Sequence, residues 1–334
     1  MIELVKQSKS QKVNTAETLY NVFSEEVNSG LERNPKCLPS KYFYDQKGDA
    51  LFVKIMNLPE YYLTRSELEI FQHKTNQLIN ALELHPERYF ELVELGAGDG
   101  LKTKELLKVL EHQNYKFDYL PIDISSNALN LLEDNLKQEL PKVSVKTKQG
   151  DYFKVLDALK ESKHPKIILF LGSNIGNMSD SAATKFMTKL SANLNPEDKL
   201  LLGVDLIKSK SVVLPAYNDS QGVTAAFNLN LLARINAELG ADFNLNQFKH
   251  KPEYDENEGI AKSFIESCVN QIVTIKALGK SFKFLKGEKI HTEISRKYND
   301  TLITEIIANA NFSLDTKILD SKAYFADYIL TRNA

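Results

Sequence analysis

The chain has 334 residues, of which 43% are hydrophobic and 26% charged, values typical of a folded globular protein rather than a disordered one. Its 42 basic and 44 acidic residues are interspersed and give a net charge of -2, which excludes an extended basic surface for nucleic acid. No apolar run approaches the roughly 20 residues that cross a bilayer, and the first residues lack a signal-peptide pattern. We therefore expect a cytoplasmic protein without membrane or nucleic-acid partners. Cys37 and Cys268 are too few to indicate a disulfide framework or a metal site.

The first 85 residues are predicted to be mostly helical, and the helices of residues 1–64 are predicted to contribute to a substrate lobe. Thr64-Arg65-Ser66-Glu67 has the pattern of a capping box, which predicts the start of a helix that leads into a sheet.

Residues 65–207 alternate short apolar runs with helical periodicity, which predicts an α/β fold with a doubly wound, mainly parallel sheet. The predicted strands are Tyr89–Leu95, Phe117–Ile124, Val143–Lys148, Ile167–Gly172 and Leu200–Leu206. The predicted helices are Lys102–Leu110, Ser126–Leu136 and Ser181–Leu190, with Ser125 and Ser179 as N-caps for the second and third.

This alternation stops after Leu206, and residues 208–296 are interpreted as an inserted lobe. It is predicted to hold the helix Thr224–Leu239 and the strands Gln271–Leu278 and Glu288–Ser295. Residues 297–334 are predicted to return to the core with the helix Leu302–Ala310 and a strand, Tyr324–Leu330, at the edge of the sheet.

The strongest motif is the run Glu91–Gly100, a strand that leads directly into a glycine-rich turn and then a helix. Glycines let the backbone approach a ligand, and the helix N-terminus offers free N–H groups. A dinucleotide-binding turn has a third glycine where this chain has Leu101, which disfavours NAD or FAD. With Glu94 two residues before Gly96, the turn instead resembles the first motif of class I methyltransferases, whose S-adenosylmethionine cofactor carries no phosphate.

Two acidic residues follow the next two strands in the order that such a cofactor requires. Asp123 ends the second strand, where a carboxylate accepts hydrogen bonds from the ribose hydroxyls, and Asp151 ends the third, where a carboxylate binds the adenine amino group. A nicotinamide or flavin enzyme remains the alternative for this core.

Four segments outside the nucleotide motif combine aromatic and amide groups and suit a small polar ligand. They are Leu58–Arg65, Phe170–Asn177, Ala216–Asp219 and His291–Ser295. With VELGAGDG and AYNDSQGVTAAFNLNLL, they closely resemble the histidine-specific methyltransferases that make hercynine, the ergothioneine precursor, over nearly the whole chain. Two positions depart from that pattern: Leu63, where Pro is common, and Asn174, where Thr is frequent.

The resemblance implies a class I methyltransferase (Rossmann-like) doubly wound sheet with an inserted α+β substrate-binding lobe. We also expect a monomer. It implies that the cofactor is bound by Gly96, Lys102, Asp123, Asp151, Tyr152, Gly172 and Asn174. It implies that the substrate is bound by Tyr61, Asn177, Tyr217, Glu293 and Ser295. In this assignment Asn177 and Tyr217 hold the substrate carboxylate, while Tyr61 is the catalytic residue beside the amine.

The last of these segments can be interpreted from its chemistry as well. A strand alternates faces, so His291, Glu293 and Ser295 are expected on one side and Thr292 and Ile294 on the other. An imidazole offers both a donor and an acceptor, which suits a carboxylate and a hydroxyl better than an indole or phenyl ring does. A ligand without ring nitrogens would leave the carboxylate unpaired, a discrimination of about 10⁴ or more.

Two further features of the site remain open. Tyr61, with Tyr62 or Tyr217, is a candidate aromatic wall for a quaternary ammonium product, and no general base is evident. Methylation of another amino acid, such as a tryptophan derivative, and a non-catalytic amino-acid sensor remain alternatives.

Overall fold

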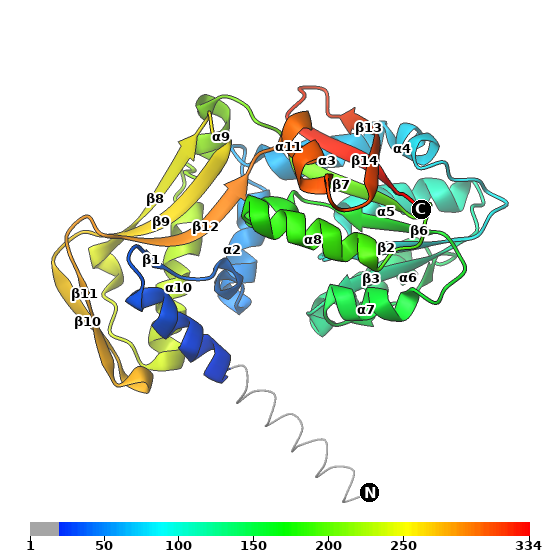
Figure 1. Cartoon of the computed structure of the whole chain (residues 1–334). Coiled ribbons are helices and arrows are strands. Elements are labelled where there is room, and N and C mark those ends of the chain that lie inside the picture. The colour runs from blue at the N-terminus through cyan, green and yellow to red at the C-terminus, as the bar shows by residue number, and fades with distance from the viewer. Residues whose placement is uncertain (1–19) are drawn as a thin grey trace, which may run out of the picture. The chain divides into compact units, whose positions relative to one another are not determined.

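The computed structural model describes residues 20–334, which form two compact units (Figure 1). Unit 1 comprises the described residues up to Tyr61 together with Lys210–Asp255 and Ala261–Ile294, and unit 2 comprises Tyr62–Ser209, Glu256–Ile260 and Ser295–Ala334. The sequence analysis divides the chain at residues 65, 208 and 297, and residues 1–19 of its N-terminal segment lie outside the described part. Within residues 20–334 no helix is long and apolar enough to cross a bilayer.

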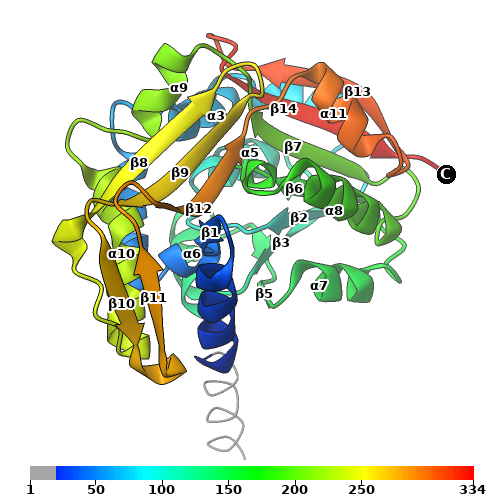
Figure 2. The ribbon, with the colours of Figure 1, turned by 60° about the vertical axis from the view of Figure 1, so that its left-hand side comes forward.

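Unit 2 is built on a sheet that has eight strands in the described part of the chain, in the order β13-β14-β7-β6-β2-β3-β4, with β5 also pairing with β3 (Figure 2). The strands are β2 Phe90–Leu95, β3 Phe117–Asp123, β4 Ser144–Val145, β5 Lys148–Gln149, β6 Lys166–Phe170, β7 Lys199–Asp205, β13 Phe312–Leu319 and β14 Phe325–Arg332. The pairs β2–β3, β2–β6 and β6–β7 are parallel. Their carboxyl ends therefore meet at one edge, where ligands bind in open α/β sheets.

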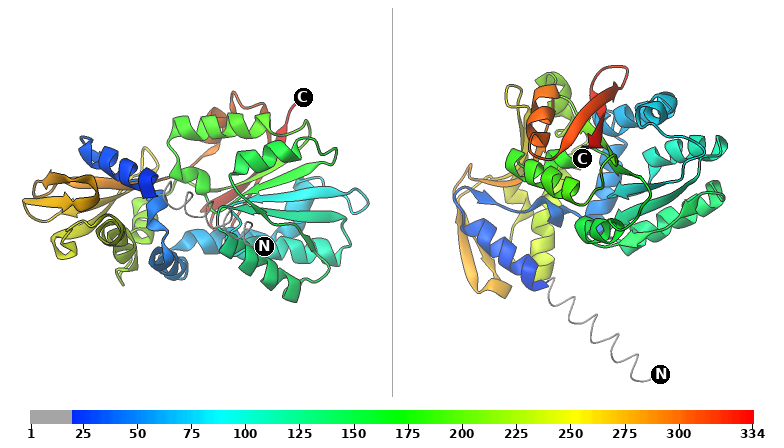
Figure 3. Two further views of the ribbon diagram at one scale, coloured as in Figure 1. Left: turned by 90° about the horizontal axis from the view of Figure 1, so that it is seen from below. Right: turned by 45° about the vertical axis from the view of Figure 1, so that its right-hand side comes forward.

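Helices cover both faces of this sheet (Figure 3). One face packs against α3 Tyr62–His73, α4 Thr75–Ala81, α5 Leu101–His112 and α6 Ser126–Glu139. The other packs against α7 Tyr152–Leu159, α8 Asp180–Ala192 and α11 Asp300–Ile307. The side chains of Ser125 and Ser179 accept hydrogen bonds from the amides of Ala128 and Ala182, so both predicted N-caps are confirmed. The predicted doubly wound α/β sheet is also confirmed.

Three sequence predictions for the core are wrong. The helix α3 begins at Tyr62, so Thr64 lies inside it and the predicted capping box does not form. The strand predicted over Val143–Lys148 is divided into the short strands β4 and β5. The strand β14 lies inside the sheet, between β7 and β13, rather than at its edge. The edge position is taken by β13, which pairs with β14 and which the sequence analysis did not predict.

Unit 1 holds a sheet of order β1-β12-β9-β8 and a separate β10–β11 hairpin. The strands are β1 Lys36–Cys37, β8 Phe248–Asp255, β9 Ile260–Ser267, β10 Gln271–Ile275, β11 Lys280–Phe284 and β12 Lys289–Arg296. The helices are α2 Gln46–Met56, α9 Lys210–Ala216, α10 Val223–Leu239 and one over residues 20–32, with short 3-10 turns η1 Ser40–Phe43, η3 Leu245–Gln247 and η4 Lys276–Leu278. The long helix α10 packs on α2 and β8. The predicted strand Gln271–Leu278 ends early, at Ile275, and continues as η4.

Candidate active site

The glycine-rich turn lies between β2 and α5, at the carboxyl edge of the unit 2 sheet. Gly96 has a φ of +74°, and a Cβ atom there would lie 2.7 Å from the Tyr152 hydroxyl and 3.9 Å from the Asn174 amide nitrogen. Gly172 has a φ of +75°, and a Cβ atom there would lie 3.4 Å from the Lys102 ammonium. Both conformations are those that glycine adopts without strain. The turn thus brings five of the predicted cofactor residues together.

Lys102, near the start of α5, is held by a residue that the sequence analysis assigned to a capping box. The carboxylate of Glu67, 1% exposed, forms an ion pair with the Lys102 ammonium. It also accepts the Gly172 amide hydrogen, at 2.9 and 3.0 Å to its two oxygens. Burial lowers the pKa of Lys102, but the charge and hydrogen bond of Glu67, together with the charges of Glu94 and Asp327, outweigh burial and raise that pKa. Lys102 therefore stays charged beside the glycine turn.

Glu94, near the end of β2, connects the elements on either side of the same turn. It is buried, and its carboxyl group accepts hydrogen bonds from the Thr103 hydroxyl, at 2.8 Å, and from the Tyr119 hydroxyl. Burial raises its pKa to about 7, against the opposing effect of these hydrogen bonds. Because these partners lie on α5 and β3, Glu94 fixes the strands and the helix around the turn instead of facing a ligand.

The two predicted acidic residues lie at successive carboxyl ends along the sheet. Asp123 ends β3, and one of its oxygens accepts the Ser125 amide hydrogen at 2.9 Å. Asp151 is the N-cap of α7, with one oxygen accepting from the amides of Phe153 and Lys154. Burial, and after it the charges of Asp123 and Asp151, raises the pKa of Tyr152 to about 12. Ile124 directly follows Asp123 and is 77% exposed, which leaves apolar surface beside the carboxylate.

The segment after β6 carries Asn174 and Asn177 as the first and last residues of a 3-10 turn, η2 Asn174–Asn177. Ser173, which precedes it, has a φ of +56°, and its hydroxyl accepts the Asp205 amide hydrogen at 3.0 Å. The turn is therefore fixed to the carboxyl end of β7.

Tyr217, in unit 1, follows α9 and is 8% exposed. Its carbonyl oxygen lies 2.8 Å from the His250 ring nitrogen Nε2, and burial lowers the pKa of His250, so the ring is neutral. Two residues further on, Asp219 accepts hydrogen bonds from the amides of Val223 and Thr224, at 2.8 and 2.7 Å, at the start of α10. The segment Ala216–Asp219 is thereby fixed at both ends.

Tyr61 belongs to an aromatic cluster of unit 1. Its ring centroid lies 6.4 Å from that of Phe52, which lies 5.6 Å from Tyr44 and 5.9 Å from Phe227. Tyr62, the next residue, is part of unit 2 and donates its hydroxyl hydrogen to Asp205 at 2.7 Å. Phe52, a residue that the sequence analysis did not consider, therefore packs against Tyr61.

Glu293 and Ser295 both lie on β12. Ile290 and Thr292 are buried while His291 and Glu293 are half-buried, as alternation requires, but at Ile294 the alternation of burial ends. Burial, and after it the Glu293 charge, raises the pKa of the Tyr44 phenol. Glu293 therefore lies near Tyr44, whose ring packs on Phe52 in the aromatic cluster that contains Tyr61.

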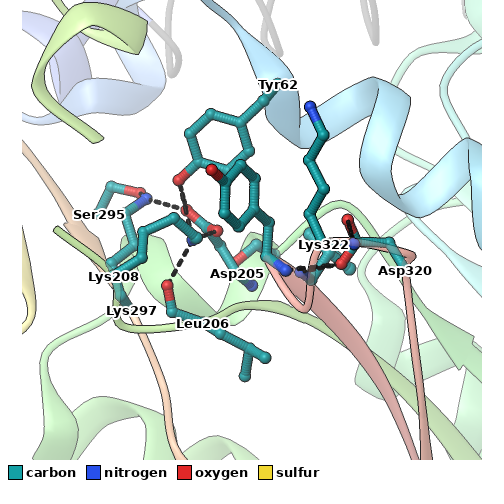
Figure 4. Close-up of polar contacts among 11 residues, drawn as sticks. Tyr62, Asp205, Leu206, Lys208, Ser295, Lys297, Asp320 and Lys322 are labelled. Atoms are coloured by element: carbon teal, nitrogen blue, oxygen red, sulfur yellow. Dashed lines mark hydrogen bonds and ion pairs between the residues drawn. The ribbon is translucent and has the colours of Figure 1, made fainter. Parts of the chain in front are cut away.

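Ser295 belongs to a cluster of buried charged and polar residues in unit 2 that the sequence analysis missed (Figure 4). This Asp205 cluster consists of Tyr62, Asp205, Lys208, Ser295 and Lys297. Asp205 and Lys297 are both fully buried, 2.7 Å apart, and the Lys297 ammonium donates to the Ser295 hydroxyl at 2.9 Å. Lys208 also pairs with Asp205. An acid at the end of an apolar strand was the only sign of this cluster in the sequence.

The class of protein follows from the sheet order and from the chemistry of the ligand that its carboxyl edge can take. One ammonium, two carboxylates and two glycines with positive φ lie along this edge, and such a set of groups suits an amino acid joined to a nucleoside. The protein is therefore an S-adenosylmethionine-dependent methyltransferase with the class I fold.

Comparison with known proteins narrows this class. The model of the family described as histidine-specific, S-adenosylmethionine-dependent methyltransferases matches residues 23–332, and the chain belongs to this family. It is 36% identical to the histidine N-alpha-methyltransferase of Mycobacterium tuberculosis, over 85% of this chain and 87% of that protein. It is 34% identical to the enzyme of the same name from Mycolicibacterium smegmatis, over 88% and 90% of the two chains. It is also 31% identical to ergothioneine biosynthesis protein 1 of Schizosaccharomyces pombe, over 96% of this chain but 42% of that longer protein.

Proposed function

We propose that the protein transfers methyl groups to the α-amine of free L-histidine and, by three transfers, forms the betaine hercynine for ergothioneine synthesis. The observation that carries this proposal is the extent of the family match. It spans residues 23–332 and so includes the substrate segments of unit 1 as well as the nucleotide-binding sheet of unit 2. A likeness confined to the sheet would support methyl transfer alone, because one fold serves many functions.

We assign cofactor binding to Gly96, Lys102, Asp123, Asp151, Tyr152, Gly172 and Asn174. S-adenosylmethionine supplies a methyl group on a sulfonium ion. In our assignment Lys102 binds its carboxylate, and the carboxylates of Asp123 and Asp151 accept hydrogen bonds from its ribose and adenine. The exposed Ile124 beside Asp123 offers apolar surface to the flat base.

For the substrate, we assign the carboxylate to Asn177 and Tyr217, the amine to Tyr61 and the imidazole to Glu293 and Ser295. The amide of Asn177 and the phenol of Tyr217 both donate hydrogen bonds to a carboxylate. Holding the amine in line with the methyl group can supply up to roughly 7–11 kcal/mol of the barrier. The amine reacts in its neutral form. An α-amine has a pKa of about 8 in a peptide and a higher one in a free amino acid, so a minor neutral fraction is present at cellular pH.

The trimethylated product is a cation that donates no hydrogen bond, so it needs another kind of contact. Aromatic faces attract such cations by about 0.5–2 kcal/mol. Tyr61 and the ring of Phe52 beside it are the candidates for this contact.

The proposal is tested by mass spectrometry of the purified protein incubated with S-adenosylmethionine and an equimolar mixture of the twenty amino acids. We expect histidine alone to gain one, two and finally three methyl groups. Methylation of another amino acid, such as tryptophan, would keep the reaction and overturn the imidazole assignment. The absence of any methylation would favour a sensor that binds both ligands without turnover.

We further propose that the enzyme works in the cytoplasm as a monomer without membrane or nucleic-acid partners, in keeping with its interspersed charges and net charge of -2. Light scattering coupled to size-exclusion chromatography tests the monomer, since a mass near 37.8 kDa is expected and twice that mass would refute it.

A further inference from the structure

The Asp205 cluster places two ammonium groups against a single carboxylate. Asp205 and Lys297 have no exposed side-chain surface and Lys208 has 7%, so the three charges are almost wholly removed from water. The Tyr62 hydroxyl donates to Asp205 at 2.7 Å, and the Lys208 ammonium lies 3.0 Å from that hydroxyl. Buried charges are costly unless paired and hydrogen-bonded, so a network of this kind is a specific feature of the fold.

The cluster also connects two segments with assigned ligand roles. Its Lys297 ammonium donates to Ser295, and the backbone amide of Asp205 donates to Ser173 at 3.0 Å, next to Asn174. Ser295 belongs to the proposed substrate residues and Asn174 to the proposed cofactor residues. Asp205 thus lies between them at the carboxyl end of β7.

The direction of the Lys297–Ser295 bond follows from chemistry. An ammonium carries only donors, so the Ser295 oxygen must accept and its own hydrogen must point away from Lys297. Because Lys297 is itself paired with Asp205, its ammonium keeps the Ser295 O–H hydrogen from pointing toward the buried pair.

We infer that Lys297 is a positioning residue for substrate recognition, which holds the Ser295 hydroxyl as a hydrogen-bond donor toward an unprotonated imidazole nitrogen. This inference rests on the proposed function. The Glu293 carboxylate then accepts a hydrogen bond from the N–H of the other ring nitrogen. Ser295 as donor and Glu293 as acceptor together select a neutral imidazole in one orientation. Asp205 acts one step further away, by holding Lys297.

The test is a double-mutant cycle between Lys297→Met and Ser295→Ala, read as the KM for histidine, kcat and the Kd for S-adenosylmethionine. We expect each single variant to raise KM roughly 3- to 10-fold, the range for one hydrogen bond, with little change in kcat or cofactor Kd. The double variant should be no worse than Ser295→Ala alone, because Lys297 acts through Ser295.

Lys166→Met is the matched control. Lys166 is also fully buried and forms an ion pair with the buried carboxylate of Asp198, at 3.2 Å. This pair lies at the amino ends of β6 and β7, away from the carboxyl ends where the ligands are proposed to bind. It should leave the KM for histidine unchanged even where stability falls. A similar rise in KM for both lysine variants would overturn the inference, since it would show a general structural effect.

The outcomes distinguish a failure of the Lys297 inference from a failure of the proposed function. If Ser295→Ala raises KM and Lys297→Met adds its full factor on top, Lys297 acts independently of Ser295 and the inference alone is overturned. If Ser295→Ala leaves KM unchanged, the imidazole assignment of the proposed function is wrong. Should Lys297→Met fail to fold, Lys297→Gln takes its place in the cycle. It keeps a shorter, neutral donor, and the same non-additivity is expected.

Discussion

Glu67→Gln tests whether the ion pair beside the glycine turn holds Lys102, a proposed cofactor-binding residue, in place. Glutamine keeps a carbonyl oxygen for the Gly172 amide but loses the charge that pairs with Lys102. A charge-assisted hydrogen bond contributes about 1.5–3 kcal/mol. The Lys102 side chain is 21% exposed, so water recovers part of this and about 2 kcal/mol remains.

This loss should appear in two measurements. Thermal unfolding should show a Tm lower by roughly 4–8 °C, given about 2–4 °C per kcal/mol for a unit of this size. Calorimetric titration should show S-adenosylmethionine binding weakened by up to about 30-fold, because roughly 1.4 kcal/mol corresponds to a tenfold change in Kd.

Glu87→Gln is the control, because Glu87 pairs with Lys116 on the surface with side chains 90% and 58% exposed. Pairs as exposed as this one contribute little to stability because water screens them, so neither Tm nor cofactor Kd should change much. If Glu67→Gln behaves like Glu87→Gln in both measurements, the reasoning that Glu67 positions Lys102 is refuted.

Three further substitutions probe the turn, the core and the substrate residues. Gly96→Ala should weaken cofactor binding at least about tenfold in calorimetry, because its Cβ would lie 2.7 Å from the Tyr152 hydroxyl and a φ of +74° costs a side chain about 1–2 kcal/mol; an unchanged Kd would contradict this. Burial, and after it the charge of Glu67, raises the pKa of Asp327 well above its ordinary value, and neither of its carboxyl oxygens has a hydrogen-bond partner among the described residues. The folded state therefore keeps a proton that the unfolded chain releases above about pH 4, so stability declines as pH rises from there, and Asp327→Asn should flatten this decline in Tm measured against pH. Glu293→Ala should raise the KM for histidine at least about tenfold in steady-state kinetics, through loss of a charged hydrogen bond, while the cofactor Kd stays the same; an unaltered KM would exclude Glu293 from imidazole binding.

The sequence predicted the parallel core well because its strands are buried on both faces and appear as apolar runs. The strands β2, β6 and β7 are almost wholly buried, and their predicted bounds differ from the observed ones by at most two residues. The serine N-caps were also evident, since capping depends on residues only three positions apart.

The strands that escaped prediction have one exposed face or lie at an edge. The strand β8 alternates charged and aromatic residues and contains Pro252, which normally counts against a strand. Proline is tolerated there because β8 is the edge strand of its sheet. The edge strand β13 has as many polar as apolar residues and carries a register shift between Leu314 and Thr316.

Tertiary contacts explain why the site was only partly predicted. The glycines and the strand-end acids could be located because each follows from one strand and the turn after it. Glu67 was misinterpreted because its partners, Lys102 and Gly172, come from other elements of the chain. Lys297 was missed for the same reason, since only the fold brings it to Asp205.

The strand β7 is bracketed by buried ion pairs, with Asp198 immediately before it paired to Lys166 and Asp205 at its end paired to Lys297. A slip of one residue would turn every side chain to the opposite face and would separate both pairs at once. Breaking a buried pair costs about 3–5 kcal/mol, so such an error would be penalised at both ends of the strand. The run Leu200–Leu202 is apolar at every position, so its hydrophobic pattern alone does not distinguish one register from the next. The ion pairs at the two ends of β7 therefore determine which register is favoured.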